Sequence, residues 1–146
     1  MDTVNLAHPA FIQIIERLTP DEALLLSAIN GRNIIPFGGL KANLHEGGHN
    51  TIIDTCTDLI STPNLGFPQS VPTYLDNLTS VGILNKDSGT WLVKDEPYNQ
   101  IADIYAFNAL EEAIKENPLF SSIERSKGIY TITEFGKSFI KACLNH

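Results

Sequence analysis

The amino-acid sequence predicts an α+β fold for this chain of 146 residues. Apolar residues recur with helical spacing in several segments, and these segments alternate with short runs of β-branched and aromatic residues. The strand-like runs occupy residues 83–86, 90–93 and 128–132. Pro, Thr and Gly residues stand where elements should begin or end, which gives each element a defined place in the chain.

Two helices are expected near the start of the chain. The first begins at His8 and Pro9, because proline is favoured at the first helical position, and its apolar residues share one face. That stripe consists of Phe11, Ile12, Ile15 and Leu18. The second helix begins with a capping box from Thr19 to Glu22 and stops at Gly31.

Residues 31–69 are rich in Gly, Asn, Pro, Thr and Ser. Ile34 and Ile35 precede Pro36, so we expect only a short strand or an edge strand there. Further on, five apolar residues have helical spacing and predict a short helix. These are Ile52, Ile53, Cys56, Leu59 and Ile60.

A clearer helix is predicted over residues 70–81, where apolar residues share a face and Gly82 ends the pattern. The strand-like runs 83–86 and 90–93 flank a Gly-containing turn, which predicts a β-hairpin. A long helix should then cover residues 97–116, because Pro97 suits its first turn and Pro118 its end.

The chain is expected to end with a strand and a helix. Residues 128–132 are mostly β-branched or aromatic, and Thr133 is a favourable N-cap for the final helix. The order of elements is that of a winged-helix-like domain, with residues 95–125 as a helical insertion between the wing strands. We therefore expect residues 1–146 to form a single domain.

Several segments resemble the bacterial abortive infection alpha (Abi-alpha) family, specifically its C-terminal domain of unknown function. The matching segments are HPAFI (8–12), LTPDEA (18–23), YLDNL (74–78), GIL (82–84), YTITEFG (130–136) and FIKAC (139–143). The resemblance implies a role in phage defence by sacrifice of the infected cell, and it implies no catalytic residue. Because family members usually carry an additional N-terminal helical region, we expect the chain to be excised from a longer protein.

The charge is unevenly distributed along the chain. The net charge is −7, but the residues from Arg125 onward carry +3 and residues 1–124 carry −10. An acidic chain is not expected to bind nucleic acid as its main partner. Two cysteines, no apolar run long enough for a membrane span and no secretory signal indicate a cytoplasmic protein.

The long helix supplies the candidate partner-binding residues. Eight of the ten residues from Ile101 to Leu110 are apolar, an arc wider than one packing surface requires. Either this helix is buried within its own domain, or it contacts a protein partner, a second copy or a missing segment. The candidate contact residues are Ile104, Tyr105, Phe107 and Leu110.

Four cations near the C-terminus are candidates for contact with an anion or nucleic acid. They are Arg125, Lys127, Lys137 and Lys141. The alternative is a solvated helix face, which is the commoner use of such residues. The helix at residues 70–81, where a winged helix would contact DNA, contains no Lys or Arg, which disfavours DNA binding there.

The segment from His45 to His49 matches the H-E-x-x-H zinc-protease pattern, which needs both histidines on one helical face. Its central Gly47 and Gly48 each cost a helix about 1 kcal/mol relative to alanine. We therefore treat His45 and His49 as weak metal candidates only. No phosphate-binding, dinucleotide-binding or nucleophile motif is present in the sequence, so no metal, cofactor or catalytic residue is expected.

The sequence thus favours a non-enzymatic protein-interaction module of a phage-defence protein, which binds a partner or itself through residues 97–116. One alternative is a DNA-binding winged-helix transcriptional regulator. The other is a metal-dependent hydrolase that uses the HEGGH segment.

Overall fold

The computed structural model describes residues 9–144, so His8, where the first helix was expected to start, lies outside the described residues. The described chain is a mixture of helices and a four-stranded sheet, which confirms the predicted α+β class. It divides into two compact units. Unit 1 comprises residues up to 35, 59–86 and from 130 onward, and unit 2 comprises residues 36–58 and 87–129.

Unit 1 is mainly helical. Its helices are α2 (Pro9–Arg17), α3 (Pro20–Ile29), α4 (Val71–Ser80) and α7 (Glu134–Leu144), together with the 3-10 turn η2 (Pro68–Ser70). The predicted capping box is confirmed, because the Thr19 hydroxyl accepts from the Glu22 N–H and the Thr19 N–H donates to the Glu22 carboxylate. Phe11 of α2 packs edge-on against Phe135 and Phe139, with ring centroids 5.4 and 5.3 Å away.

The sheet has the strand order β2-β1-β4-β3. The strands are β1 (Ile34–Leu44), β2 (His49–Cys56), β3 (Leu84–Asp87) and β4 (Phe120–Ile132), and the 3-10 turn η1 (Asp58–Ser61) follows β2. β1 and β2 pair in antiparallel register from Gly38 opposite Cys56 to Asn43 opposite His49.

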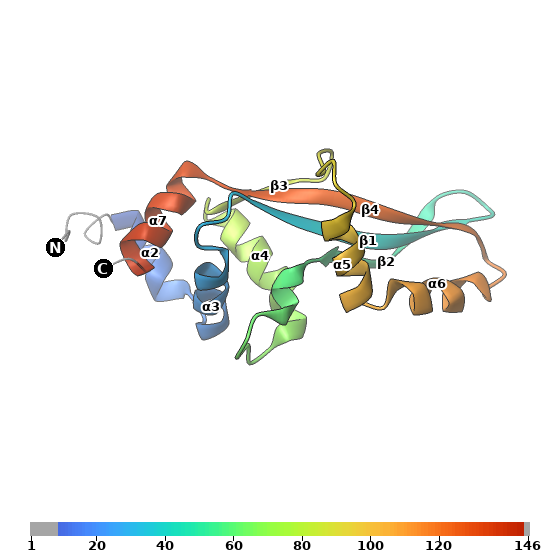
Figure 1. Ribbon diagram of the computed structural model, residues 1–146, viewed down its shortest axis with the longest axis horizontal. Coiled ribbons are helices and arrows are strands. Elements are labelled where there is room, and N and C mark those ends of the chain that lie inside the picture. Colours follow the sequence, from blue (N-terminus) through green and yellow to red (C-terminus); the bar gives the residue numbers. More distant parts are fainter. Residues whose placement is uncertain (1–8, 145–146) are drawn as a thin grey trace. The chain divides into compact units, whose positions relative to one another are not determined.

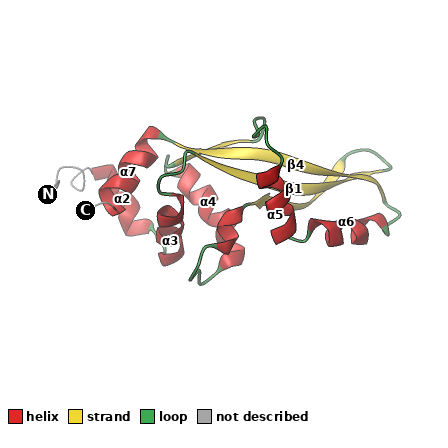
Figure 2. Ribbon diagram, in the orientation of Figure 1, coloured by secondary structure: helices red, strands yellow, loops and turns green. Residues whose placement is uncertain are grey.

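Unit 2 packs two helices, α5 (Glu96–Ile104) and α6 (Phe107–Lys115), against its strands. Figures 1 and 2 show both helices along the same face of β1 and β4. The buried core of this unit consists of Leu40, Cys56, Tyr98, Ile101, Ala102 and Phe107. No helix among residues 9–144 is long and apolar enough to cross a membrane.

The prediction for residues 31–69 was wrong in two respects. Ile34 and Ile35 begin an eleven-residue strand that lies inside the sheet order, and residues 49–56 form β2 where a short helix was expected. Two register shifts interrupt the β1–β2 pairing around Leu40, which breaks the alternating pattern that identifies strands. Pro36 removes no hydrogen bond from the pairing with β2, because that pairing begins only at Gly38.

The predicted wing hairpin was also wrong in its second strand. Residues 90–93 form no strand, and the neighbour of β3 in the sheet is β4. β4 begins at Phe120, so the helical part of the expected 95–125 insertion ends at Lys115. The single helix predicted over residues 97–116 is broken at Ala106, whose φ of 55° is left-handed and cannot continue a helix.

The close approach of α7 to Ile83 requires a glycine. A Cβ atom on Gly136 would collide with the backbone carbonyl of Ile83 in unit 1. We predict that Gly136→Ala lowers the free energy of unfolding by about 1–3 kcal/mol, because overpacking outweighs the better helix propensity of alanine. Urea unfolding measures the change, and Ser138→Ala, at an exposed position of the same helix, is the control. An unchanged or higher stability of Gly136→Ala would contradict this packing.

Candidate functional site

Two adjacent carboxylates in the first turn of α3 are almost fully buried: Asp21 is 6% exposed and Glu22 is 2% exposed. Carboxylates are rarely buried unless they are hydrogen-bonded. Glu22 completes the capping box and also accepts from the Asn77 side chain of α4. The position at a helix N-terminus favours both negative charges.

Asp21 holds a loop that is distant in the sequence. Its Oδ1 accepts from the Gly66 N–H at 2.8 Å, and its Oδ2 accepts from the Phe67 N–H at 2.8 Å. The Tyr74 hydroxyl donates to the same Oδ2 at 2.9 Å. The bond from Gly66, followed by those from Phe67 and Tyr74, holds the pKa of Asp21 below its usual value, although partial desolvation opposes the shift.

This anchoring holds the backbone at Gly66 and Phe67, within residues 62–69, which we call the Phe67 loop. The Phe67 side chain is 60% exposed although its own N–H is bound to a buried carboxylate. Pro63 and Pro68 restrict the loop further, since proline fixes φ. The loop therefore displays an aromatic ring on a constrained backbone.

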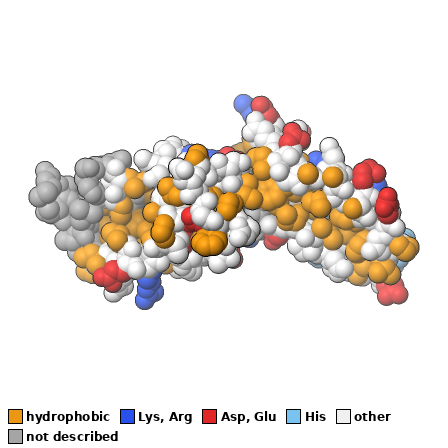
Figure 3. Space-filling view, turned by 90° about the horizontal axis from the view of Figure 1, so that it is seen from below, with side chains coloured by type: hydrophobic (Ala, Val, Ile, Leu, Met, Phe, Trp, Pro, Cys, Tyr) orange, Lys and Arg blue, Asp and Glu red, His pale blue; other side chains and the backbone are white. Residues whose placement is uncertain are grey.

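The predicted contact residues of the long helix differ in their exposure. Phe107 is 3% exposed and belongs to the core of unit 2, and Tyr105 and Leu110 pack half-buried against that core. Ile104 is 44% exposed. Figure 3 shows hydrophobic side chains gathered over the α5 and α6 end of the face in view. Partner binding through these four residues stays a prediction. Ile104 is the one among them whose side chain is exposed.

The four predicted cations lie in different units. Arg125 of unit 2 bonds to Glu111 through Nε at 2.9 Å and through Nη2 at 2.7 Å, which raises the pKa of Arg125 and lowers that of Glu111. Lys127, also of unit 2, lies 3.0 Å from Asp95. In unit 1, Lys137 lies 3.4 Å from Glu134, and Lys141 is exposed on α7.

Residues 45–48 of the HEGGH segment form the turn between β1 and β2, and His49 is the first residue of β2. The Gly47 N–H donates to the Leu44 carbonyl, the Leu44 N–H donates to the Gly48 carbonyl, and both glycines have positive φ. The zinc-protease pattern needs His45 and His49 on one helical face, and residues 45–49 form no helix. Within residues 9–144, no group of three or more His, Cys, Asp or Glu side chains is arranged to hold a metal.

Comparison with known proteins identifies the family. The model of the abortive infection alpha family matches residues 1–143. The chain belongs to the abortive infection alpha family. This confirms the resemblance found in the sequence and associates the chain with abortive infection, a form of phage defence.

Other comparisons inform the fold of this Abi-alpha chain. No curated protein matches it. A solved structure of an uncharacterized protein from the hydrocarbon-degrading marine bacterium Alcanivorax borkumensis SK2 is similar, with a TM-score of 0.51 and 16% sequence identity. The match covers 89% of each chain, and at this identity it shows a shared fold alone.

Sequence reasoning missed three of the residues considered for a site in this Abi-alpha chain: Asp21 of α3, and Phe67 and Trp91 of two loops. Asp21 was interpreted only as part of a capping box, and Phe67 and Trp91 have no periodicity around them. A usable signal for Phe67 was its setting between Gly66 and Pro68, which marks a turn that exposes its middle residue. Trp91 lies in the run 90–93 that was expected to be a strand, but these residues form no strand and Trp91 is 56% exposed.

The Asp21 anchor gives a pH prediction. Because the folded pKa is lowered, the stabilisation is complete above the pKa of an unfolded aspartate, about 3.9, and is lost as the pH falls through the folded pKa. Asp21→Asn should lower the melting temperature at neutral pH. The amide nitrogen of asparagine is itself a donor, so it cannot accept from the N–H groups and the hydroxyl that now bind the carboxylate. The variant should also lose less stability than the wild type on acidification below about pH 4.

Thermal unfolding at several pH values tests this expectation. Asp76→Asn is the matched control, because Asp76 is an exposed carboxylate on α4. Equal melting temperatures for Asp21→Asn and wild type at neutral pH would show that the anchor does not stabilise the fold.

Proposed function

We propose that the chain is a non-enzymatic protein-interaction module of a phage-defence protein, and that it binds its protein partner through the Phe67 loop. The observation that carries the proposal is the combination of an exposed aromatic ring with an anchored backbone. Aromatic side chains are frequent binding hot spots, and a preorganised loop loses little conformational entropy on binding.

Two carboxylates with lowered pKa values are used in internal bonds, which supports an interaction role. Asp21 binds the Phe67 loop, and Glu111 binds Arg125. Burial, followed by the nearby Asp54 charge, raises the pKa of the Cys56 thiol to about 12. The thiol is therefore protonated at neutral pH and is not an activated nucleophile.

We also infer that unit 1 is winged-helix-like. In chain order it contains α2, α3, the first residues of β1, α4, β3, the last residues of β4 and α7. In such an arrangement α4 would be the helix that contacts DNA. Its Tyr74 and Asn77 side chains instead bind the carboxylates of α3, and α4 has no Lys or Arg, so protein binding is favoured over the regulator alternative.

Site-specific photo-crosslinking tests the interaction. We predict that a photoreactive p-benzoylphenylalanine at position 67 captures one defined protein band on irradiation of phage-infected cells. The same group at Val93, which is 99% exposed in unit 2, is the control and should capture no such band. A band of twice the chain's mass would identify a second copy as the partner.

A substitution gives a second measure of the same contact. Phe67→Ser should weaken binding to the captured protein by about 30-fold or more, the loss expected for a hot-spot aromatic residue. Its melting temperature should stay close to that of the wild type, because the side chain is exposed. Crosslinking that is equal at positions 67 and 93, or binding unaffected by Phe67→Ser, would overturn the proposal.

A further inference from the structure

Strand β2 lies at one edge of the sheet, because β1 is its one neighbour in the strand order of the described residues. Edge strands often carry Lys or Pro, which oppose pairing with a further strand, but β2 contains neither. Five of its first six side chains are exposed, and they are His49, Asn50, Thr51, Ile52 and Asp54. This edge of the sheet is therefore open to another strand.

The hydrogen bonds of the β1–β2 hairpin show which backbone groups of β2 point away from β1. The Leu44 N–H donates to the Gly48 carbonyl, so these two residues form a hydrogen-bonded pair. The register then runs through three opposite pairs: Asn43 and His49, Ala42 and Asn50, and Lys41 and Thr51. Bonded and non-bonded pairs alternate along an antiparallel ladder. Asn50 is therefore bonded to β1, whereas the N–H and C=O groups of His49 and Thr51 point to the free side.

These outward groups can hold an added strand. His49 and Thr51 each offer one backbone donor and one acceptor, so together they can form up to four hydrogen bonds with an extended segment. Ile52 adds an apolar side chain that is 36% exposed. A register shift follows Thr51 and ends the regular pairing, so the added strand pairs over a short stretch. We call residues 49–52 the open β2 edge.

An acidic side chain lies beyond each end of the open β2 edge. Glu46 lies in the preceding turn and Asp54 follows the register shift, and both are exposed. Within residues 9–144, neither carboxylate forms an ion pair. Unit 2 as a whole has five basic and eleven acidic residues. Charge complementarity therefore favours a segment with basic residues at its ends.

A second copy of the chain fits the open β2 edge less well than a basic segment does. Two antiparallel copies that use the outward groups of both His49 and Thr51 must place His49 opposite Thr51 of the other copy. The same register brings Glu46 of each copy towards Asp54 of the other. Like charges opposite each other destabilise a pair of strands, so self-association through this edge is disfavoured.

We propose that the open β2 edge binds an extended segment of a partner protein, which adds to the sheet as a further strand and carries a basic residue at each end. Backbone hydrogen bonds provide the affinity, and Glu46 and Asp54 select the basic ends. The open β2 edge belongs to unit 2 and the Phe67 loop belongs to unit 1. Binding at either surface can therefore be lost without loss of the other.

A designed peptide tests strand addition. The probe has eight residues, with arginine at both ends and alternating threonine and valine between them, and it spans about 26 Å when extended. A fluorescein-labelled probe is titrated with the whole chain at low salt, and anisotropy reports binding. We expect the bound probe to protect the amide protons of His49 and Thr51 from hydrogen exchange. The Asn50 amide proton, which faces β1, should change little and is the internal control.

Two further peptides separate strand addition from attraction between charges. A peptide with glutamate at both ends should bind about tenfold more weakly or worse, because it meets Glu46 and Asp54. A peptide that is N-methylated at its central residues keeps both arginines but cannot donate backbone hydrogen bonds there, so it should protect neither amide. Equal binding of the N-methylated peptide and the probe would overturn strand addition. Equal binding of the glutamate peptide would overturn the selection of basic ends.

A backbone variant tests the same contact from the side of the protein. Thr51→Pro removes an N–H that points away from β1, so it should weaken probe binding by about tenfold with little change in melting temperature. Thr51→Ala retains the N–H and should bind the probe like the wild type. Undiminished binding by Thr51→Pro would overturn the proposal. A dimer that sedimentation velocity detects and Thr51→Pro dissociates would also overturn it, by assigning the edge to a second copy.

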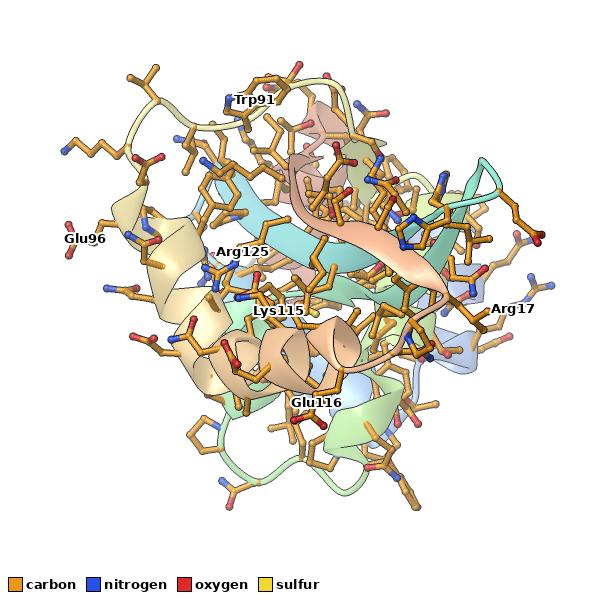
Figure 4. The ribbon with its side chains drawn as sticks, turned by 90° about the vertical axis from the view of Figure 1, so that its right-hand side faces the viewer. Arg17, Trp91, Glu96, Lys115, Glu116 and Arg125 are labelled. Atoms are coloured by element: carbon orange, nitrogen blue, oxygen red, sulfur yellow. The ribbon has the colours of Figure 1, made fainter. Side chains whose placement is uncertain are left out.

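Charge variants test the two carboxylates. Glu46→Gln combined with Asp54→Asn should weaken binding of the arginine probe and reduce its preference over the glutamate peptide. The control is Glu112→Gln combined with Glu116→Gln, which makes the same change in net charge at α6. Figure 4 shows Glu116 at the end of that helix. An equal effect of both double variants would show that only the overall charge matters, and would remove Glu46 and Asp54 from the site.

Discussion

The two carboxylates at the start of α3 are the constraint that joins α3, the Phe67 loop and α4 within unit 1. Glu22 closes the capping box and reaches Asn77, and Asp21 binds two backbone N–H groups of the Phe67 loop and the Tyr74 hydroxyl. One helical turn therefore fixes its own start, a loop about 45 residues away and one face of α4. The charges are buried at little cost because each oxygen has donors and because the helix N-terminus is electropositive.

Unit 2 contains a similar arrangement. The Tyr98 hydroxyl accepts from the Leu92 N–H and donates to the Gly128 carbonyl. In both units a buried polar group secures a loop whose aromatic side chain is left in solvent. These internal hydrogen bonds hold the backbone of each loop in place and leave the aromatic side chain exposed.

Local sequence signals predicted what depends on local interactions. The capping box at Thr19, the helix of residues 70–81 and the final helix after Thr133 all follow from caps and periodicity. β1 and β2 could not be predicted, because their register shifts disrupt the alternation of side chains. The break at Ala106 was hidden because alanine is a strong helix former and its left-handed φ depends on tertiary packing. The contact between Asp21 of α3 and Phe67 was missed for a similar reason, since the two residues are brought together only by the folded chain.

The chain passes from one unit to the other at four places, near residues 35, 58, 86 and 129. Unit 2 is therefore built from two separate chain segments, and unit 1 is completed only when residues 130–144 have been added. An interruption of the chain anywhere between residues 36 and 128 leaves neither unit whole. For a member of the abortive infection alpha family, this order of assembly means that an incompletely synthesised chain has neither unit finished.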